Sequence, residues 1–356
     1  MAYKILYIED LNPDSIIKKF KTQEFEVIHK EPEDFEDTLD AILKESPDAL
    51  MLDFRLTSKS ARFDAPVVAQ SLRTKKSGTY RDIPIVLISS ESNITGYYQD
   101  FTSQDLFDFV VEKKEFRKNS ELHIQKIKSF IESYQKIKTE KFKVHKTLGI
   151  SLKEYRELDY RIQERFEHIE IKDDVYAIAR TINQELIQMT GVLIDEYVLS
   201  ARLGVSIKSS DWIKLKEKLS VYQYTGILHD VFPRWWMEKI TNWWIKEIDN
   251  NMPLKRLSAT ERVEKIKAKT DLTELQPIPL PKHAVSTRYW NACKDTQVAL
   301  DTIDGLEIST RELKAWQDKE YISINAGLEK EPHEKFLKPF SREKMKTIAL
   351  KLNNDE

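Results

Sequence analysis

The first 118 residues alternate five short apolar runs with helical patterns, and this alternation restricts the fold more than any other feature of the chain. The apolar runs are Tyr3–Ile8, Phe25–His29, Ala49–Leu52, Pro84–Ile88 and Phe107–Val111. The main helical patterns between them cover Ser15–Phe20, Phe35–Lys44 and Val67–Arg73. Short runs of strand-forming residues that alternate with helices predict an α/β domain, a doubly wound parallel five-stranded sheet with helices on both faces.

Charged and polar residues follow the predicted strands. Glu9 and Asp10 end the first run, Asp53 the third, Ser89 the fourth and Lys113 the fifth. Ligands of open parallel sheets bind at the carboxyl ends of the strands, so we expect these side chains to meet at one edge. Hard carboxylate oxygens suit Mg²⁺, and an aspartate can act as a nucleophile toward phosphorus while a lysine neutralises the phosphoryl oxygens. The pattern predicts a Mg²⁺-dependent phosphoacceptor site.

Within that site, Asp10 and Asp53 are the first candidates for metal ligands, and Asp53 is the predicted nucleophile. Lys113 is the predicted clamp on the phosphoryl group, although its neighbour Lys114 leaves the choice open by one position. A hydrogen bond from the Ser89 hydroxyl to the phosphoryl group would pull its loop inward and change the surface.

The motifs Lys4-Ile5-Leu6-Tyr7-Ile8-Glu9-Asp10, Leu50-Met51-Leu52-Asp53, Val86-Leu87-Ile88-Ser89-Ser90 and Val110-Val111-Glu112-Lys113 resemble the receiver domain of two-component response regulators. The resemblance implies a flavodoxin-like receiver over residues 1–118. It also implies that Glu9 joins Asp10 and Asp53 as a metal ligand and that the Arg55 backbone carbonyl contributes. The implied partner is a sensor histidine kinase, in a two-component phosphorelay.

The sequence departs from the receiver pattern in three places. No proline follows Lys113, and the stretch Thr57–Asp82, with Lys75-Lys76-Ser77-Gly78, reads as a long polar surface loop. Arg55 lies two positions beyond Asp53, and Glu91 lies two positions beyond Ser89. In receivers, the residues at these positions flank the line along which water attacks the phosphoryl group. An ion pair between them would lengthen the lifetime of the phosphoryl group, and two solvated charges are the alternative.

Beyond residue 118 the chain is predicted to be mostly helical. Glu121–Lys138 reads as a connecting helix, and Asp173–Leu203 as the centre of a helical bundle. Ser151, Ser258 and Ser309 each begin a helix-start motif. Pro277–Pro281 is the one proline-rich stretch. We predict a receiver at 1–118, a helical domain at 119–276, and a proline-rich linker with a C-terminal helical segment at 277–356.

This helical part carries no recognisable catalytic motif. Phosphate-binding glycine motifs and zinc-binding spacings are absent from the sequence, and His229-Asp230 is an isolated pair. Enzymatic activity is therefore expected, at most, as self-phosphorylation and autodephosphorylation at Asp53. The segment Arg234–Trp244 holds four of the seven tryptophans. We interpret it as bundle core, with a partner interface as the alternative.

Charge and composition restrict the partners. The formal net charge is −2, from 57 basic and 59 acidic residues, so no global field favours nucleic acid or an anionic membrane. No apolar stretch has the length of about 20 residues that a membrane helix needs. The lone Cys293 cannot form an internal disulfide, and no signal sequence begins the chain, which favours a cytoplasmic protein.

A receiver followed by a helical region with an aromatic segment resembles the response-receiver proteins of bacterial conflict systems, including the receiver component of Detocs-type antiphage defence. That resemblance implies a phosphoryl sink or a contact-based regulator. Two alternatives stay open: a pseudo-receiver scaffold that binds protein partners and is never phosphorylated, and a receiver that regulates an unrecognised helical effector.

Overall fold

The computed structural model describes residues 2–20, 24–57, 62–74, 82–90 and 106–354. The chain divides into two compact units. Unit 1 comprises Met1–Ile182 and Gly226–Val231, and unit 2 comprises Asn183–Thr225 and Phe232–Glu356. All seven tryptophans belong to unit 2, so their fluorescence reports that unit alone.

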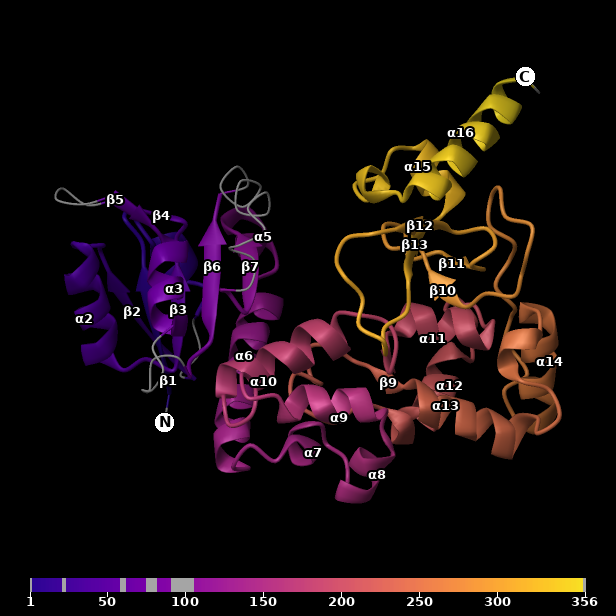
Figure 1. Ribbon diagram of the computed structural model, residues 1–356, viewed down its shortest axis with the longest axis horizontal. Helices are drawn as coiled ribbons and strands as arrows, with labels where there is room; N and C mark the ends of the chain where they lie inside the picture. The colour runs from indigo at the N-terminus through magenta and orange to yellow at the C-terminus, as the bar shows by residue number, and fades with distance from the viewer. Residues whose placement is uncertain (1, 21–23, 58–61, 75–81, 91–105, 355–356) are drawn as a thin grey trace. The chain divides into compact units, whose positions relative to one another are not determined.

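Unit 1 is built on a five-stranded parallel sheet (Figure 1). Its strands are β1 (Tyr3–Ile8), β2 (Phe25–Lys30), β3 (Ala49–Leu52), β6 (Ile85–Ser89) and β7 (Phe109–Glu112). All neighbours pair in parallel, in the order β2-β1-β3-β6-β7. This is the strand order of flavodoxin-like sheets, with the order reversing between β1 and β3. The predicted fold class is confirmed.

Helices cover both faces of this sheet, which explains why its strands are continuous apolar runs. α2 (Phe35–Glu45) and α3 (Ala65–Thr74) pack on one face, and all four residues of β3 are fully buried. The Asp34 side chain caps α2 by accepting a hydrogen bond from the Asp37 amide at 2.9 Å. α1 (Asp14–Ile17) contacts α5 (Lys113–Lys118), and the ring of Phe20, which follows α1, stacks on Phe116 of α5.

A small hairpin follows β3 directly. β4 (Arg55–Thr57) pairs antiparallel with β5 (Arg62–Asp64), with Arg55 opposite Asp64. The hairpin is anchored because Leu56 is fully buried in the core that contains α2 and α3. The predicted polar loop therefore includes an ordered hairpin and α3, while Lys75-Lys76-Ser77-Gly78 lies outside the described residues.

The predicted connecting helix is α6 (Ser120–Thr139). Its apolar stripe is buried at Ile127, Phe130 and Ile131, and the Phe130 ring stacks on Phe109 of β7. Leu122, in the first turn of the helix, is 59% exposed. The helix thus packs on the sheet of unit 1 through its middle and later turns.

A buried polar network joins α6 to the rest of unit 1. Arg73 of α3 donates to Asp108 at 2.9 Å, and Tyr134 of α6 donates to the other oxygen of Asp108 at 2.6 Å. The Arg73 guanidinium also lies 3.8 Å from the ring centre of Tyr176. Tyr176 belongs to α10 (Val175–Thr181), which contacts α6.

Short helices complete unit 1. They are α7 (Val144–Thr147), α8 (Leu152–Glu157) and α9 (Tyr160–Glu167), and the predicted capping box at Ser151 begins α8. The separate segment Gly226–Val231 also belongs here. Its Ile227 amide donates to the Thr147 carbonyl at 2.9 Å, and its Asp230 carboxylate accepts from Ser129 and Gln125 of α6.

Unit 2 begins where the predicted long pattern Asp173–Leu203 is interrupted. After α10 come the π-helix η1 (Ile182–Ile187), a turn through Gly191 and β8 (Leu193–Ile194), and only then α11 (Glu196–Leu203). Gly191 is required at this turn because a Cβ atom would lie 2.2 Å from the Trp316 carbonyl oxygen. The predicted pattern Asp173–Leu203 is therefore made of three separate helical elements, α10, η1 and α11, joined by the turn and β8.

The core of unit 2 contains the tryptophan segment. Trp235, Trp243 and Trp244 are buried in one cluster with residues of the helices around them, so the bundle-core interpretation is confirmed. The elements are α12 (Trp212–Lys218), η2 (Ser220–Tyr222), β9 (Trp235–Trp236), α13 (Met237–Trp243), η3 (Trp244–Ile248), η4 (Leu254–Arg256) and α14 (Ala259–Lys269). The helix start predicted at Ser258 is confirmed, and a capping box between Ser258 and Glu261 begins α14.

The end of unit 2 mixes short strands and helices. They are β10 (Asn291–Ala292), β11 (Ala299–Leu300), β12 (Leu306–Ile308), β13 (Glu320–Ile322), α15 (Ile324–Leu328), η5 (Glu334–Phe336) and α16 (Pro339–Asn354). The helix start predicted at Ser309 is wrong, because residues 309–312 form an irregular link between β12 and β13. Thr310 in this link donates its hydroxyl to Glu320.

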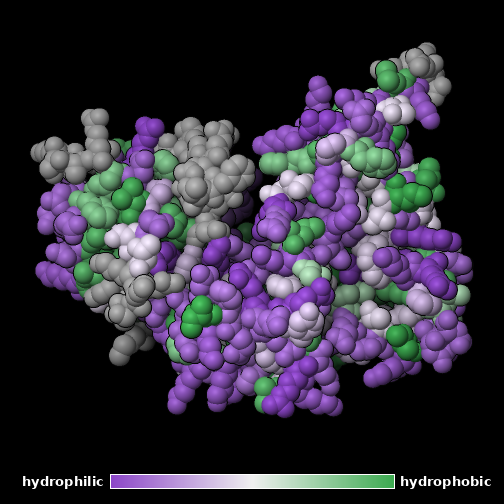
Figure 2. Space-filling model, viewed as in Figure 1, coloured by the Kyte–Doolittle hydropathy of each residue, from purple (hydrophilic) through white to green (hydrophobic). Residues whose placement is uncertain are grey.

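The surface in view in Figure 2 is mostly hydrophilic, with scattered apolar residues. Among the described helices, none combines the length and the apolar character that crossing a bilayer requires.

Candidate functional site

The carboxyl ends of β1 and β3 bring three acidic residues together. Glu9 and Asp10 follow β1, and Asp53 follows β3. The two strands pair with Ile8 opposite Leu52, and the Asp53 amide donates to the Ile8 carbonyl at 3.0 Å. One ligand oxygen from each of the three carboxylates lies within 4.8 Å of the others. The predicted convergence at this sheet edge is therefore present.

Two of these carboxylates are removed from solvent. Glu9 is 1% exposed and Asp53 is 6% exposed, whereas Asp10 is half-buried. Burying a carboxylate is unfavourable unless a cation or hydrogen-bond donors compensate it. The site must therefore contain positive charge.

Lys113 supplies part of that charge. Its Nζ lies 2.5 Å from Glu9 Oε2 and 3.3 Å from Asp53 Oδ1. Lys113 is the first residue of α5, directly after β7, and its neighbour Lys114 is exposed. Of the two lysines considered from the sequence, Lys113 is the one that reaches the carboxylates.

Two residues that the sequence analysis did not identify hold Glu9 in place. The Tyr7 hydroxyl donates to Glu9 Oε2 at 2.6 Å, and the His29 ring nitrogen Nε2 lies 2.9 Å from the Glu9 carbonyl oxygen. Burial, together with the hydrogen bond to Glu9, raises the pKa of Tyr7 well above its usual range, so the phenol remains a donor. The contact of Tyr7 with Glu9 could have been predicted from the sequence. The two residues are two positions apart, and residues with this spacing on a strand face the same side.

Ser89 and Arg55 border the site differently. Ser89 is fully buried at the end of β6, where it pairs in register with Glu112, the residue before Lys113. Arg55 lies two residues beyond Asp53 at the start of β4, and its side chain is exposed. Glu91 lies outside the described residues, so the Arg55–Glu91 ion pair stays a prediction.

The donor set fits a divalent cation. Three carboxylates against one ammonium leave two formal negative charges. Apart from the ion pair with Lys113 at 3.3 Å, the buried Asp53 Oδ1 has no hydrogen-bond donor among the residues that the structure describes. Carboxylate oxygens are the ligands that Mg²⁺ prefers, and one or two carboxylates usually suffice. Glu9, Asp10 and Asp53 are thus chemically suited to hold Mg²⁺.

Comparison with solved structures finds similarity to receiver domains over the N-terminal 36% of the chain. A putative response regulator from Chloroflexus aurantiacus is 18% identical, with 36% of this chain and 98% of that chain covered and a TM-score of 0.29. The BeF3-activated RstA receiver domain of Klebsiella pneumoniae is 18% identical, with 36% and 97% covered and a TM-score of 0.28.

A third similar structure is the receiver domain of the sensor histidine kinase PA1611 from Pseudomonas aeruginosa, which holds a magnesium ion in its active-site cleft. It is 17% identical, with 37% of this chain and 98% of that chain covered and a TM-score of 0.29. No protein-family model matches the sequence, and no curated protein matches it.

Proposed function

We propose that this chain is a cytoplasmic phosphoacceptor protein that takes a phosphoryl group from a sensor histidine kinase onto Asp53. The observation that carries the proposal is the position of Lys113 Nζ between Glu9 and Asp53, at the sheet edge where three carboxylates meet. A nucleophilic carboxylate beside a lysine and a carboxylate cluster is the set of groups that phosphoryl transfer to aspartate requires.

In the proposed reaction, a carboxylate oxygen of Asp53 attacks the phosphorus of a phosphohistidine. The bond between phosphorus and the histidine nitrogen breaks, the electron pair stays on the imidazole, and an aspartyl phosphate forms. Lys113 contacts the phosphoryl oxygens and neutralises their charge, and Tyr7 keeps Glu9 oriented. Glu9, Asp10, Asp53 and the Arg55 carbonyl would hold Mg²⁺, which supplies charge neutralisation when bound.

The proposed output is a change of contacts. A hydrogen bond from Ser89 to the phosphoryl group would move the end of β6, and a phosphoryl group on Asp53 would alter the ion pairs of Lys113. The protein then acts as a phosphoryl sink or a contact-based regulator in a two-component-like, antiphage signalling system.

The decisive experiment is the intact mass of the full chain after incubation with acetyl phosphate and Mg²⁺. We expect a gain of one phosphoryl group, about 80 Da, that is lost in Asp53→Asn and without Mg²⁺. Asp48→Asn is the matched control, because Asp48 lies just before β3 and Asp53 just after it. No gain with acetyl phosphate or with a phosphorylated kinase would reject phosphotransfer and favour the scaffold alternative.

A further inference from the structure

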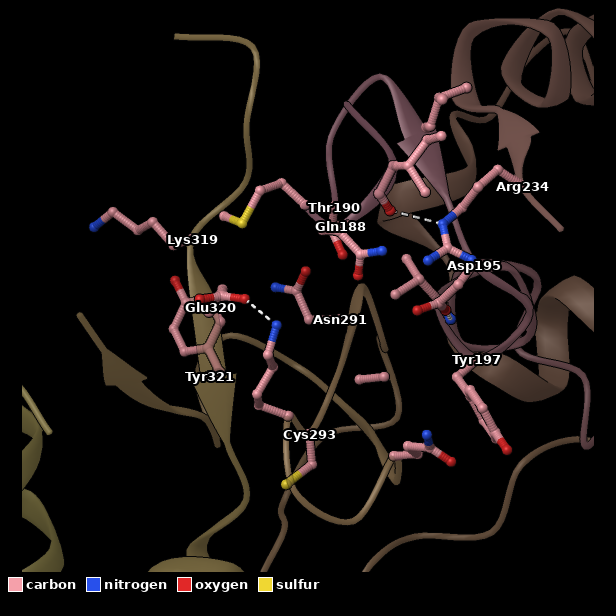
Figure 3. Close-up of a pocket in the computed structure, with 17 residues that line it drawn as sticks. Gln188, Thr190, Asp195, Tyr197, Arg234, Asn291, Cys293, Lys319, Glu320 and Tyr321 are labelled. Atoms are coloured by element: carbon pink, nitrogen blue, oxygen red, sulfur yellow. Dashed lines mark hydrogen bonds and ion pairs between the residues drawn. The ribbon is translucent and has the colours of Figure 1, made fainter. Parts of the chain in front are cut away.

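Unit 2 contains a cavity of about 220 Å³ that the proposed phosphotransfer does not use (Figure 3). Its wall combines the turn that follows η1, the start of α11, the residue before β9, and segments of β10 and β13. The volume is below the range of about 300–1,000 Å³ that is common for drug-sized ligands, so an occupant must be small. π-helices such as η1 are frequent beside functional sites.

Asn291 is the most informative residue of the wall. It is 6% exposed, and its side chain points into the cavity in Figure 3. The Asn291 backbone pairs with Leu300 of β11, but within the described part of the chain its side-chain amide has no hydrogen-bond partner. Buried polar groups are nearly always hydrogen-bonded in native proteins. An unpartnered buried amide that faces a cavity therefore indicates a polar ligand.

Arg234 offers the cavity a fixed positive charge. Its Nε donates to the Ile187 carbonyl at 2.8 Å, and its Nη1 donates to the Pro233 carbonyl at 2.9 Å. The described residues provide no acceptor for Nη2. These two hydrogen bonds hold the guanidinium in place and leave Nη2 available to an oxyanion. A carboxylate matches the geometry of a guanidinium.

Asp195 offers the opposite charge. Its Oδ1 accepts from the Val198 amide at 2.8 Å and caps α11, whereas Oδ2 has no hydrogen-bond partner among the described residues. Burial lowers the pKa of Arg234, while the nearby Asp195 carboxylate raises it. The other charges in the wall are already paired, Lys294 with Glu320 at 2.5 Å and Lys319 with Glu307 at 3.0 Å.

We propose that this cavity binds a free α-amino acid. The ligand carboxylate pairs with Arg234 Nη2, the ligand ammonium pairs with Asp195 Oδ2, and the Asn291 amide bonds to a remaining polar atom. One open cation, one open anion and one open amide in a small cavity match a zwitterion better than a simple anion. Occupation of this site does not depend on phosphorylation of Asp53.

The test is a calorimetric titration of the full chain with each of the twenty free amino acids, with tryptophan fluorescence as a second readout. We expect saturable binding of at least one amino acid. Its N-acetylated derivative, which lacks the ammonium, should bind at least about tenfold more weakly. Asp53→Asn should bind as the wild type does, which separates this proposal from the proposed function.

Three variants locate the site. Asp195→Asn keeps an N-cap acceptor but removes the charge, so the fold is retained while affinity falls at least about tenfold. Arg234→Gln and Asn291→Leu should lose binding. Asp34→Asn, the same change at the N-cap of α2, is the matched control and should leave the affinity unchanged.

The proposal is overturned if no amino acid binds, or if the three variants bind as the wild type does. Equal affinity for the N-acetylated derivative would also overturn it, as would binding of inorganic phosphate alone, since each would identify a simple anion site. Should Arg234→Gln or Asn291→Leu fail to fold, as judged by circular dichroism, the Asp195→Asn result decides.

Discussion

Lys113 Nζ lies 2.5 Å from Glu9 Oε2, although the two residues are separated by 104 positions in the sequence. The same nitrogen lies 3.3 Å from Asp53 Oδ1. The positive charge is thus already positioned beside the proposed acceptor before any phosphoryl group arrives. Preorganised charges of this kind need no rearrangement during the reaction.

Replacing Lys113 is expected to slow phosphorylation. Lys113→Ala should lower the rate of phosphoryl gain from acetyl phosphate at least about tenfold, because the phosphoryl oxygens lose a charged donor. Lys114→Ala is the matched control, since that side chain is exposed, and its rate should stay within about twofold of the wild type. Time-resolved intact mass measures both rates. Equal rates for the two variants would exclude the assigned role of Lys113.

The hydrogen bond from Tyr7 to Glu9 is expected to stabilise unit 1. Tyr7→Phe removes a donor to a buried carboxylate and should cost about 1.5–3 kcal/mol in the free energy of unfolding. Tyr3→Phe is the control, because its hydrogen bond to Glu132 is exposed, and it should cost less than about 0.5 kcal/mol. Urea unfolding followed by far-ultraviolet circular dichroism measures the loss, and tryptophan fluorescence separates the transition of unit 2.

The Arg73–Asp108 ion pair is expected to be essential for unit 1. Both side chains are buried, and Asp108→Ala leaves the Arg73 guanidinium without its counterion. Breaking such a buried pair costs about 3–5 kcal/mol. Glu157→Ala, which removes an exposed pair with Lys153, should cost at most about 1 kcal/mol. Comparable losses in the two variants would mean that the network contributes no more than a surface pair.

His123 is expected to make unit 1 sensitive to acid. Burial lowers its pKa from 6.5, and neither ring nitrogen has a hydrogen-bond partner in the described part of the chain. The His123 ring binds a proton more readily in the unfolded chain than in the folded chain. The free energy of unfolding of unit 1 therefore decreases as the pH falls below 6.5, and it continues to decrease until the pH reaches the lower pKa of the folded state.

His123→Phe should remove this part of the pH dependence, since the ring can still stack on Phe116 but no longer titrates. His168→Phe, at an exposed histidine of the same unit, should retain the wild-type dependence. The measurement is the urea midpoint of unit 1 at about pH 8 and about pH 5.5. An unchanged pH dependence in His123→Phe would remove His123 as the cause.

The sheet was predictable because its signals are local. Each buried parallel strand is a continuous apolar run, and each site residue follows such a run, so position in the sequence gives position at the sheet edge. The predicted strand limits agree with the structure to within two residues at each end. The same topology predicts that Lys113 and Glu9 lie close together. It does not predict the distance between their side-chain atoms.

The remaining features depend on contacts between distant residues. Nothing near Ser309 signals that its helix-start motif would form an irregular link instead, because Thr310 pairs with Glu320. The hairpin after β3 depends on the burial of Leu56 under two helices. The cavity around Asn291 combines segments that are up to 134 positions apart, Ile187 to Tyr321, and so leaves no linear motif. The division at residues 118 and 276 stays a prediction.

The segment Gly226–Val231 belongs to unit 1 although the chain on both sides of it belongs to unit 2. The polypeptide therefore passes between the units three times, after residues 182, 225 and 231. A gene fragment that ends at residue 182 would lose Asp230 and leave Ser129 and Gln125 of α6 without their acceptor. A single recombination event cannot exchange one complete unit for another, because the segments of the two units alternate along the chain. We therefore expect the two units to have been inherited together.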